Sequence, residues 1–171
     1  PTPLPTQLAI ATVTALADGW ESLRPGLAAR NMPVMGNSGE RLATLSILRL
    51  EPQAFRFAVG YIGESNQSLP LSLSEWQTRS QALLVVNGGY YRISETQQYL
   101  SNGLTIANGQ VFGSSYVGFG GMLTIDSTGT PELRSLRLQP YQFGEKWQSA
   151  LQSFPMLLTA DGAPVAIDDT Q

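Results

Sequence analysis

The 171-residue sequence contains no cysteine and no histidine. The absence of cysteine excludes disulfide bonds, thiolate metal sites and cysteine nucleophiles. The absence of histidine removes the commonest general base and zinc ligand, so a serine–histidine hydrolase mechanism within this chain is excluded too. The 13 acidic residues form no tight group of the kind that a metal site or a carboxylate pair needs. We therefore expect neither a metal nor a cofactor.

Charged residues are also scarce, at 13% of the sequence, which is about half the usual share. A net charge of −3 gives no electrostatic signature of nucleic-acid binding. Nine of the ten basic residues are arginine; arginine is the better bidentate phosphate ligand, but biased genomic composition explains this ratio equally well. No apolar run approaches the roughly 18 residues of a membrane span. We expect neither a nucleic-acid partner nor a transmembrane segment in this chain.

The sequence is instead rich in turn residues, with 17 glycines and 11 prolines. Together with the low charge, this composition favours a β-rich fold over a helical bundle. The length suits one domain. We predict an α+β, mainly β domain over residues 20–171, with a mixed, twisted sheet, hairpins and a few short helices. Residues 1–19 are expected to form a linker or lead-in segment.

Several strands and hairpins follow from the alternation of apolar segments and turn residues. The strict period of two from Phe55 to Tyr61 predicts a strand with one buried face. Turn residues predict hairpins that join the following pairs of segments: Leu27–Val34 with Arg41–Leu50, Leu104–Ala107 with Val111–Phe112, Met122–Asp126 with Glu132–Leu138, and Phe154–Thr159 with Pro164–Ile167.

Two short helices are also predicted. A capping box, formed by Ser72 with Glu75 or by Ser74 with Gln77, indicates a helix over Trp76 to Ser80. The apolar residues between Glu145 and Ser153 fit one face of a second helix.

The stretch from Gln81 to Tyr91 is the centre of the functional argument. The apolar run Ala82–Val86 predicts a strand buried on both faces, and it ends at Asn87-Gly88-Gly89. An amide and bare glycine N–H groups at such a strand end can hold an anionic or sugar-like ligand. The alternative is a hairpin with Asn-Gly as its turn and with Val85-Val86 and Tyr90-Tyr91 as facing strands. The segment Arg92–Asn102 is predicted to be a polar loop, placed to cover a site.

An ordered series of short motifs resembles the phosphodiester glycosidase family, which includes the enzyme that uncovers mannose-6-phosphate by removing a capping N-acetylglucosamine. The similarity covers about residues 20 to 165. Two further family motifs, an Arg-Thr-Ala-type strand and an Asp-Gly-Gly-Gly-Ser-type loop, do not occur in this sequence. The matching pieces, in the family's order, are Pro25-Gly26-Leu27 with Arg30, Leu45–Leu50, Phe55–Tyr61, Asn87-Gly88-Gly89-Tyr90-Tyr91, Gly103-Leu104-Thr105-Ile106, Asn108-Gly109, Gly120-Gly121 and Leu151-Gln152-Ser153-Phe154-Pro155.

The resemblance implies hydrolysis of a sugar-1-phosphate diester with release of the sugar, and therefore a carbohydrate or sugar-phosphate ligand. It places Asn87 in the catalytic site. By the resemblance, Gln152 and Ser153 border the same pocket. On the residues alone, a helix end before Phe154-Pro155 explains them better. The arginines are candidates for neutralising the phosphate. The candidate substrate-binding residues are Gly88, Gly89, Tyr90, Arg92, Gln152, Ser153 and Arg30.

Two other functions stay open: a glycan-binding module without catalysis, and a structural subunit of a larger assembly. Because the family's acid–base carboxylate and second arginine belong to the absent motifs, we expect a further segment or a second polypeptide to complete the domain. The resemblance, with a proline–threonine start that lacks methionine, also favours an extracytoplasmic location.

Overall fold

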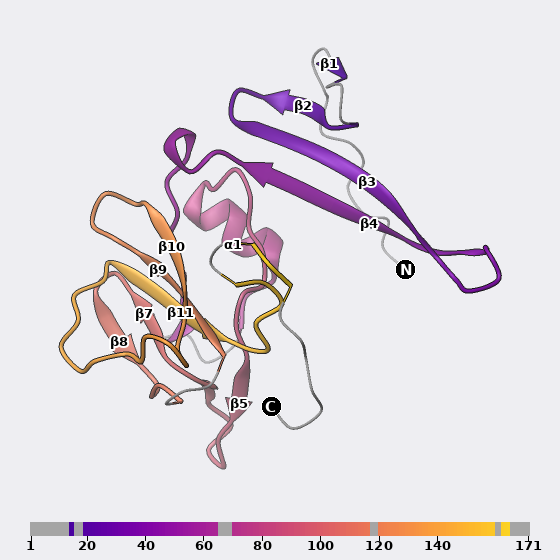
Figure 1. Ribbon diagram of the computed structural model, residues 1–171. Coiled ribbons are helices and arrows are strands. Elements are labelled where there is room, and N and C mark those ends of the chain that lie inside the picture. The colour runs from indigo at the N-terminus through magenta and orange to yellow at the C-terminus, as the bar shows by residue number, and fades with distance from the viewer. Residues whose placement is uncertain (1–13, 16–18, 65–69, 117–119, 160–161, 165–171) are drawn as a thin grey trace. The chain divides into compact units, whose positions relative to one another are not determined.

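The computed structural model describes residues 14–15, 19–64, 70–116, 120–159 and 162–164. The chain divides into two compact units, Pro1–Arg56 (unit 1) and Phe57–Gln171 (unit 2). The described strands form three sheets and the described residues include one α-helix (Figure 1). The prediction of a mainly β protein is confirmed.

Unit 1 is an antiparallel meander with strand order β1-β2-β3-β4, followed by a short 3₁₀ turn at Pro52–Ala54. The predicted hairpin of Leu27–Val34 with Arg41–Leu50 is confirmed as β3 and β4. Its turn is closed by the Gly36 N–H, which donates to the Glu40 carbonyl at 2.7 Å. The strands are β1 (Thr14–Ala15), β2 (Glu21–Arg24), β3 (Leu27–Met35) and β4 (Arg41–Leu50).

The β3–β4 ribbon buries little of its apolar surface. Leu27 and Ala28, at the base of β3, are buried. Farther along, a cross-strand hydrogen bond joins Ser46 Oγ to Asn31 Oδ1 at 2.7 Å. The large apolar side chains that stay exposed on the ribbon are Met32, Val34, Met35, Leu42, Leu45 and Leu48.

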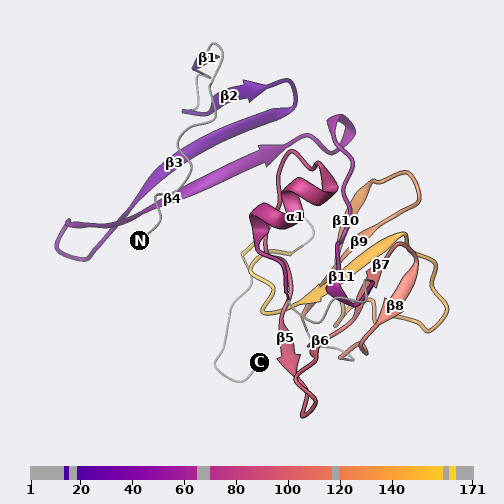
Figure 2. The same cartoon turned by 180° about the vertical axis from the view of Figure 1, so that it is seen from behind.

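Unit 2 contains the larger sheet, with strand order β10-β9-β11-β7-β8, and a two-stranded sheet of β5 and β6 (Figures 1 and 2). All strand pairings in the described part of the chain are antiparallel, so the mixed sheet that we expected is not found there. The elements are a 3₁₀ turn at Ile62–Glu64, α1 (Leu73–Ser80), β5 (Tyr91–Ile93), β6 (Tyr99–Ser101), β7 (Thr105–Ala107), β8 (Gln110–Phe112), β9 (Gly121–Ile125), β10 (Pro131–Ser135) and β11 (Ser149–Ser153).

The hydrophobic core of unit 2 lies on one face of the larger sheet. Strand β11 is inserted between β9 and β7, although it comes last in the sequence. Its Ala150 therefore lies in the middle of the buried cluster. Tyr141 and Trp147 pack against this cluster, whose other members are Leu104, Ile106, Met122 and Leu136.

Local sequence signals located several elements correctly. The turn residues Asn108 and Gly109 have φ values of 50° and 76°, and they join β7 to β8 as predicted. The predicted hairpin of β9 with β10 is also confirmed. The N-terminus of α1 has the predicted capping box, in which the Ser72 hydroxyl accepts from the Glu75 N–H and the Glu75 carboxylate accepts from the Ser72 N–H at 2.8 Å.

Two predictions of secondary structure outside the segment Gln81–Tyr91 were wrong. Phe55–Tyr61 alternates between half-buried and exposed side chains as expected, but it forms no strand. A two-residue alternation of apolar side chains indicates which of them turn inward. A strand also needs a partner for its backbone hydrogen bonds, and the alternation does not supply one. The predicted helix over Glu145–Ser153 is an irregular segment followed by β11. The predicted last hairpin is found where it is described, as an antiparallel bridge from Leu158 to Pro164, and residues 165–167 of its second arm lie outside the described residues.

Within the described residues, no helix is both long and apolar enough to cross a membrane.

Candidate functional site

The run Ala82–Val86 is not the buried strand that we predicted. It forms no strand, and Val86 is 70% exposed. A strand inside a sheet needs hydrogen-bonding partners for its backbone, and no described strand pairs with this run. The alternative hairpin is wrong as well, because Tyr91 pairs with Ser101 across β5 and β6. The chain from Ala82 to Tyr90 is therefore an irregular segment that leads from α1 to β5.

This irregular segment nevertheless packs against the larger sheet at its two glycines. A β-carbon at position 88 would lie 2.6 Å from Leu151 Cδ2, and one at position 89 would lie 2.9 Å from Leu151 Cδ1. Gly88 and Gly89 thus allow the backbone to approach β11 more closely than any other residue would. Asn87, just before them, is exposed and has no hydrogen-bond partner in the described part of the chain.

Tyr90 fastens the same segment to the end of β11. Its hydroxyl donates to the Phe154 carbonyl at 3.1 Å, and the two rings lie 5.0 Å apart between centroids. The Tyr90 carbonyl accepts from the Asn102 N–H at 3.0 Å. The structure thus brings Asn87-Gly88-Gly89-Tyr90 together with Leu151–Phe154, two segments about 60 residues apart in sequence that the family resemblance assigns to one pocket.

Gln152, a predicted substrate-binding residue, is 2% exposed and bonded on all sides. Its Oε1 accepts from the Leu104 N–H at 3.2 Å and the Tyr116 N–H at 3.0 Å, and its Nε2 donates to the Tyr116 carbonyl at 3.0 Å. A buried amide requires such partners. The side chain thus ties residues 104 and 116 to β11. The neighbouring Ser153 is half-buried and pairs with Gly121 at the end of the strand.

The two candidate arginines lie on different units. Arg92 is exposed on β5, opposite Leu100, and the predicted polar loop that begins with it is the β5–β6 hairpin. Arg30 lies on β3 of unit 1, opposite Ile47. Its contact with a phosphate stays a prediction.

Two residues that the sequence reasoning did not single out also belong to this region. Tyr116 is fixed by Gln152 through its backbone, and its hydroxyl donates to Asn102 Oδ1 at 2.5 Å. Asn102 is in turn bonded to the Tyr90 carbonyl. No local sequence signal could identify them, because their contacts join residues 14 and 36 positions apart. We define the candidate site as Asn87, Gly88, Gly89, Tyr90, Asn102 and Tyr116.

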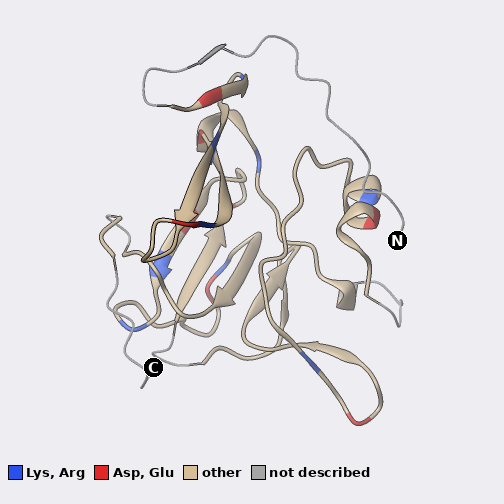
Figure 3. Cartoon of the chain, turned by 90° about the vertical axis from the view of Figure 1, so that its right-hand side faces the viewer, with Lys and Arg blue, Asp and Glu red and all other residues tan. Residues whose placement is uncertain are grey.

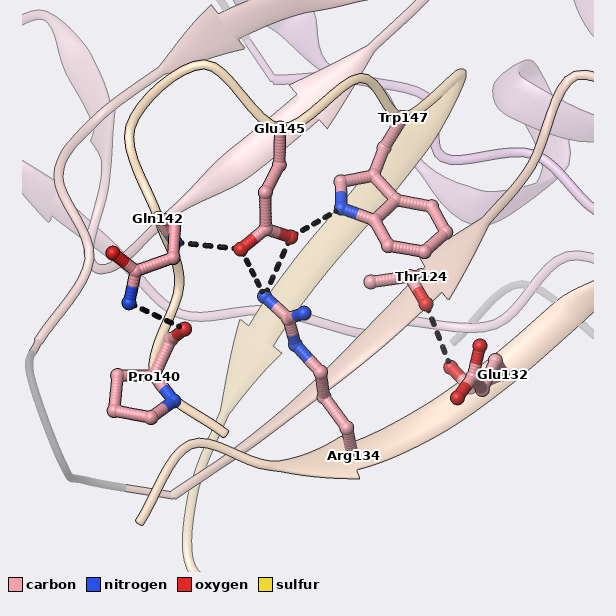
Figure 4. Close-up of polar contacts among 7 residues, drawn as sticks. All are labelled: Thr124, Glu132, Arg134, Pro140, Gln142, Glu145 and Trp147. Atoms are coloured by element: carbon pink, nitrogen blue, oxygen red, sulfur yellow. Dashed lines mark hydrogen bonds and ion pairs between the residues drawn. The ribbon is translucent and has the colours of Figure 1, made fainter. Parts of the chain in front are cut away.

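A second polar group lies at the β10 side of the larger sheet (Figure 4). Arg134 Nη2 forms an ion pair with Glu145 Oε2 at 2.8 Å, and the same oxygen accepts from Trp147 Nε1 at 2.8 Å. Oε1 of Glu145 accepts from the Gln142 N–H at 2.6 Å. Burial raises the pKa of Glu145, but these hydrogen bonds and the Arg134 charge outweigh it, so its pKa is lowered overall. Glu145 is therefore ionised at neutral pH, and its contacts with Arg134, Trp147 and Gln142 give it a structural role.

The other carboxylates with shifted pKa values also stay ionised. The pKa of Asp126 is lowered by the Thr128 hydroxyl and by backbone N–H groups of its turn, and the pKa of Glu75 is lowered by its capping partner Ser72. Glu95 is exposed in the turn between β5 and β6. The described residues contain no group of three or more acidic side chains that could hold a metal ion. Charged residues are few and distributed over separate elements (Figure 3).

Comparison with models of protein families gave no match, and neither the curated proteins nor the solved structures gave a significant one.

Proposed function

We propose that the protein binds a sugar-1-phosphate diester at the candidate site and hydrolyses it, releasing the sugar. The observation that carries this proposal is the packing of Gly88 and Gly89 on Leu151, together with the bond from Tyr90 to Phe154. These contacts hold the backbone that follows the exposed Asn87 against β11. The family resemblance locates the substrate pocket between the same two segments.

The chemistry of the site suits such a ligand. A phosphodiester carries non-bridging oxygens that need positioned donors, and the Asn87 amide and the glycine N–H groups are donors of this kind. Tyr90 is 50% exposed and Tyr116 is 46% exposed, so each has an aromatic surface that a sugar ring can contact. In the proposed reaction the bond between the anomeric carbon and the phosphate oxygen breaks. Water supplies a hydroxyl group to the sugar and a proton to the phosphate.

A glycan-binding module without turnover is the second candidate. The departing phosphate needs a proton donor, and a carboxyl group serves best when its pKa is raised toward neutrality. Within the described residues, every carboxylate with a shifted pKa has it lowered: Glu40, Glu75, Asp126 and Glu145. The described residues thus account for binding better than for proton transfer.

The two candidates are separated by one experiment with the methyl diester of N-acetylglucosamine 1-phosphate. Sugar release is measured by chromatography, and binding is measured by titration calorimetry. We expect release by the wild type and a more than tenfold lower kcat/KM for Asn87→Ala, with an unchanged circular dichroism spectrum. Gln110→Ala, at an exposed position of β8, is the control that should retain full activity. Binding without release would identify the module, and an active Asn87→Ala variant would remove Asn87 from the mechanism.

The same proposal includes two finer expectations. One is that the described sheets belong to the α+β fold of the phosphodiester glycosidases. The other is an extracytoplasmic location, which fractionation of the native source tests: recovery only from the cytosol would contradict it.

A further inference from the structure

Asn102 lies where β6 ends, beside the segment that carries Asn87. Its main-chain N–H donates to the Tyr90 carbonyl at 3.0 Å, so its position relative to Tyr90 is fixed by the backbone. Its side chain is half-buried, in contrast to the exposed side chain of Asn87.

The orientation of the Asn102 amide is set by Tyr116. Because a tyrosine hydroxyl that donates to Asn102 must meet an acceptor, the carbonyl oxygen of the amide faces Tyr116 at 2.5 Å and the NH₂ group points the other way. Tyr116 cannot easily shift, because the buried amide of Gln152 holds both its N–H and its carbonyl. The chain of contacts from Gln152 through Tyr116 to Asn102 therefore presents one amide in a defined orientation.

The NH₂ group of Asn102 has no acceptor among the described residues. This NH₂ group is not among the buried polar atoms without a partner, so it is open to solvent, and an oxygen of a ligand can take the place of water there. Asn87, which is exposed and has no hydrogen-bond partner in the described part of the chain, is a second amide on the segment that carries Tyr90.

We propose that Asn102 is a ligand-binding residue and that Tyr116 is the residue that positions it. The Nδ2 of Asn102 donates to an oxygen of the sugar phosphate, either a hydroxyl or a phosphate oxygen, while Asn87 binds a second oxygen. This inference rests on the proposed ligand site, but not on turnover at that site.

Asn102→Asp is the most informative substitution. The aspartate keeps the oxygen that accepts the Tyr116 hydroxyl, has the same size, and replaces the NH₂ donor with a negatively charged oxygen. We expect at least tenfold weaker binding of N-acetylglucosamine 1-phosphate by calorimetry. Free N-acetylglucosamine is titrated in parallel: a loss confined to the phosphate ester assigns Asn102 to the phosphate, and a loss for both assigns it to the sugar.

Tyr116→Phe tests the positioning role. The ring and both backbone bonds to Gln152 remain, so the fold should be intact, but the amide of Asn102 is free to turn. We expect about threefold to tenfold weaker binding, with KM raised and kcat nearly unchanged where turnover occurs. Gln110→Glu repeats the amide-to-acid change at the far end of the β7–β8 hairpin, and it should bind like the wild type.

The outcomes separate this inference from the proposed reaction. Binding without sugar release would contradict hydrolysis, whereas weaker binding by Asn102→Asp would still support the inference. Wild-type affinity in Asn102→Asp would overturn the role of Asn102, even if the protein is an active hydrolase. A wild type that binds neither probe would overturn both proposals.

Discussion

The two units use the same antiparallel pairing of strands, but they bury their side chains to very different extents. The ribbon of β3 and β4 in unit 1 has strands of 9 and 10 residues, yet its buried apolar residues are Leu27 and Ala28 at one end. In unit 2 the strands of the larger sheet have three to five residues, and Leu104, Ile106 and Met122 are almost completely buried. The length of a ladder therefore does not determine the size of a core.

The difference has a simple physical basis. The hydrogen bonds between paired strands replace bonds that the same backbone groups would make to water, so their net contribution to stability is modest. Burial of a large apolar side chain contributes about 1.5–3 kcal/mol. An isolated two-stranded ribbon is only marginally stable in water, whereas three or more strands with an apolar face can be stable alone. We therefore expect unit 2 to be sensitive to the loss of side-chain volume and unit 1 to be tolerant of it.

Ile106→Ala should give the largest effect. Ile106 is 1% exposed on β7, and its truncation should lower the free energy of unfolding by about 4 kcal/mol. Leu45→Ala on β4, where the side chain is 52% exposed, should change it by less than about 0.5 kcal/mol. Urea unfolding followed by circular dichroism measures both values. Equal losses would show that the ribbon is covered in solution and would remove the contrast.

Two glycines sharpen the comparison because their backbones are alike and their surroundings differ. Gly39 in unit 1 has φ of 83° and open space around it, so Gly39→Ala should cost only the strain of a left-handed backbone, about 1 kcal/mol. Gly120 in unit 2 has φ of 72°, and a β-carbon there would lie 2.4 Å from the Ser153 carbonyl oxygen. Gly120→Ala should therefore cost about 3 kcal/mol in the same unfolding assay. Similar costs would mean that β11 moves aside readily.

The Glu145 cluster should give a smaller effect than Ile106 or Gly120, together with a pH dependence. Glu145→Gln should lower the free energy of unfolding by about 2 kcal/mol at pH 7, because Arg134 loses its ion pair and its Nε already lacks a partner in the described residues. The pKa of Glu145 is lowered in the folded state. Its stabilising contribution is therefore present above the unfolded pKa of about 4.3 and is lost as the pH falls through the folded value.

The control for this prediction is Glu40→Gln in the β3–β4 turn. Glu40 is exposed and its pKa is lowered by the Ser38 hydroxyl, so the melting temperature at pH 7 should be unchanged within error. Melting temperatures between about pH 3 and pH 7 should fall less steeply for Glu145→Gln than for the wild type. Parallel curves for these two proteins would show that the ion pair does not control acid stability.

The elements that could be predicted from the sequence are those fixed by neighbouring residues. Asn108-Gly109 favours positive φ at two successive positions, and Ser72 with Glu75 satisfies the first N–H groups of a helix. Each signal acts within four residues. The failures at Ala82–Val86 and Glu145–Ser153 have the opposite origin, because their structure depends on distant partners. Ser149–Ser153 is a strand because it pairs with β9 on one side and with β7 on the other.

The candidate site shows the same division. The irregular segment Asn87-Gly88-Gly89 was singled out by its residue types, and its glycines allow the close approach to Leu151 that the structure shows. Neither the engagement of Gln152 with Leu104 and Tyr116 nor the orientation of Asn102 could be predicted, since both depend on contacts between segments far apart in sequence. Sequence located the segment that carries Asn87, and tertiary structure supplied the side chains around it.

The central position of β11 has a consequence for how unit 2 forms during synthesis. The hairpins β7–β8 and β9–β10 have short connections and can form as soon as they leave the ribosome, but each is only half of the sheet. The two halves are joined when Ser149–Ser153 pairs with both. A nascent chain that ends before β11 therefore exposes two strand edges at once, and cooperative folding of unit 2 must wait until β11 has been translated.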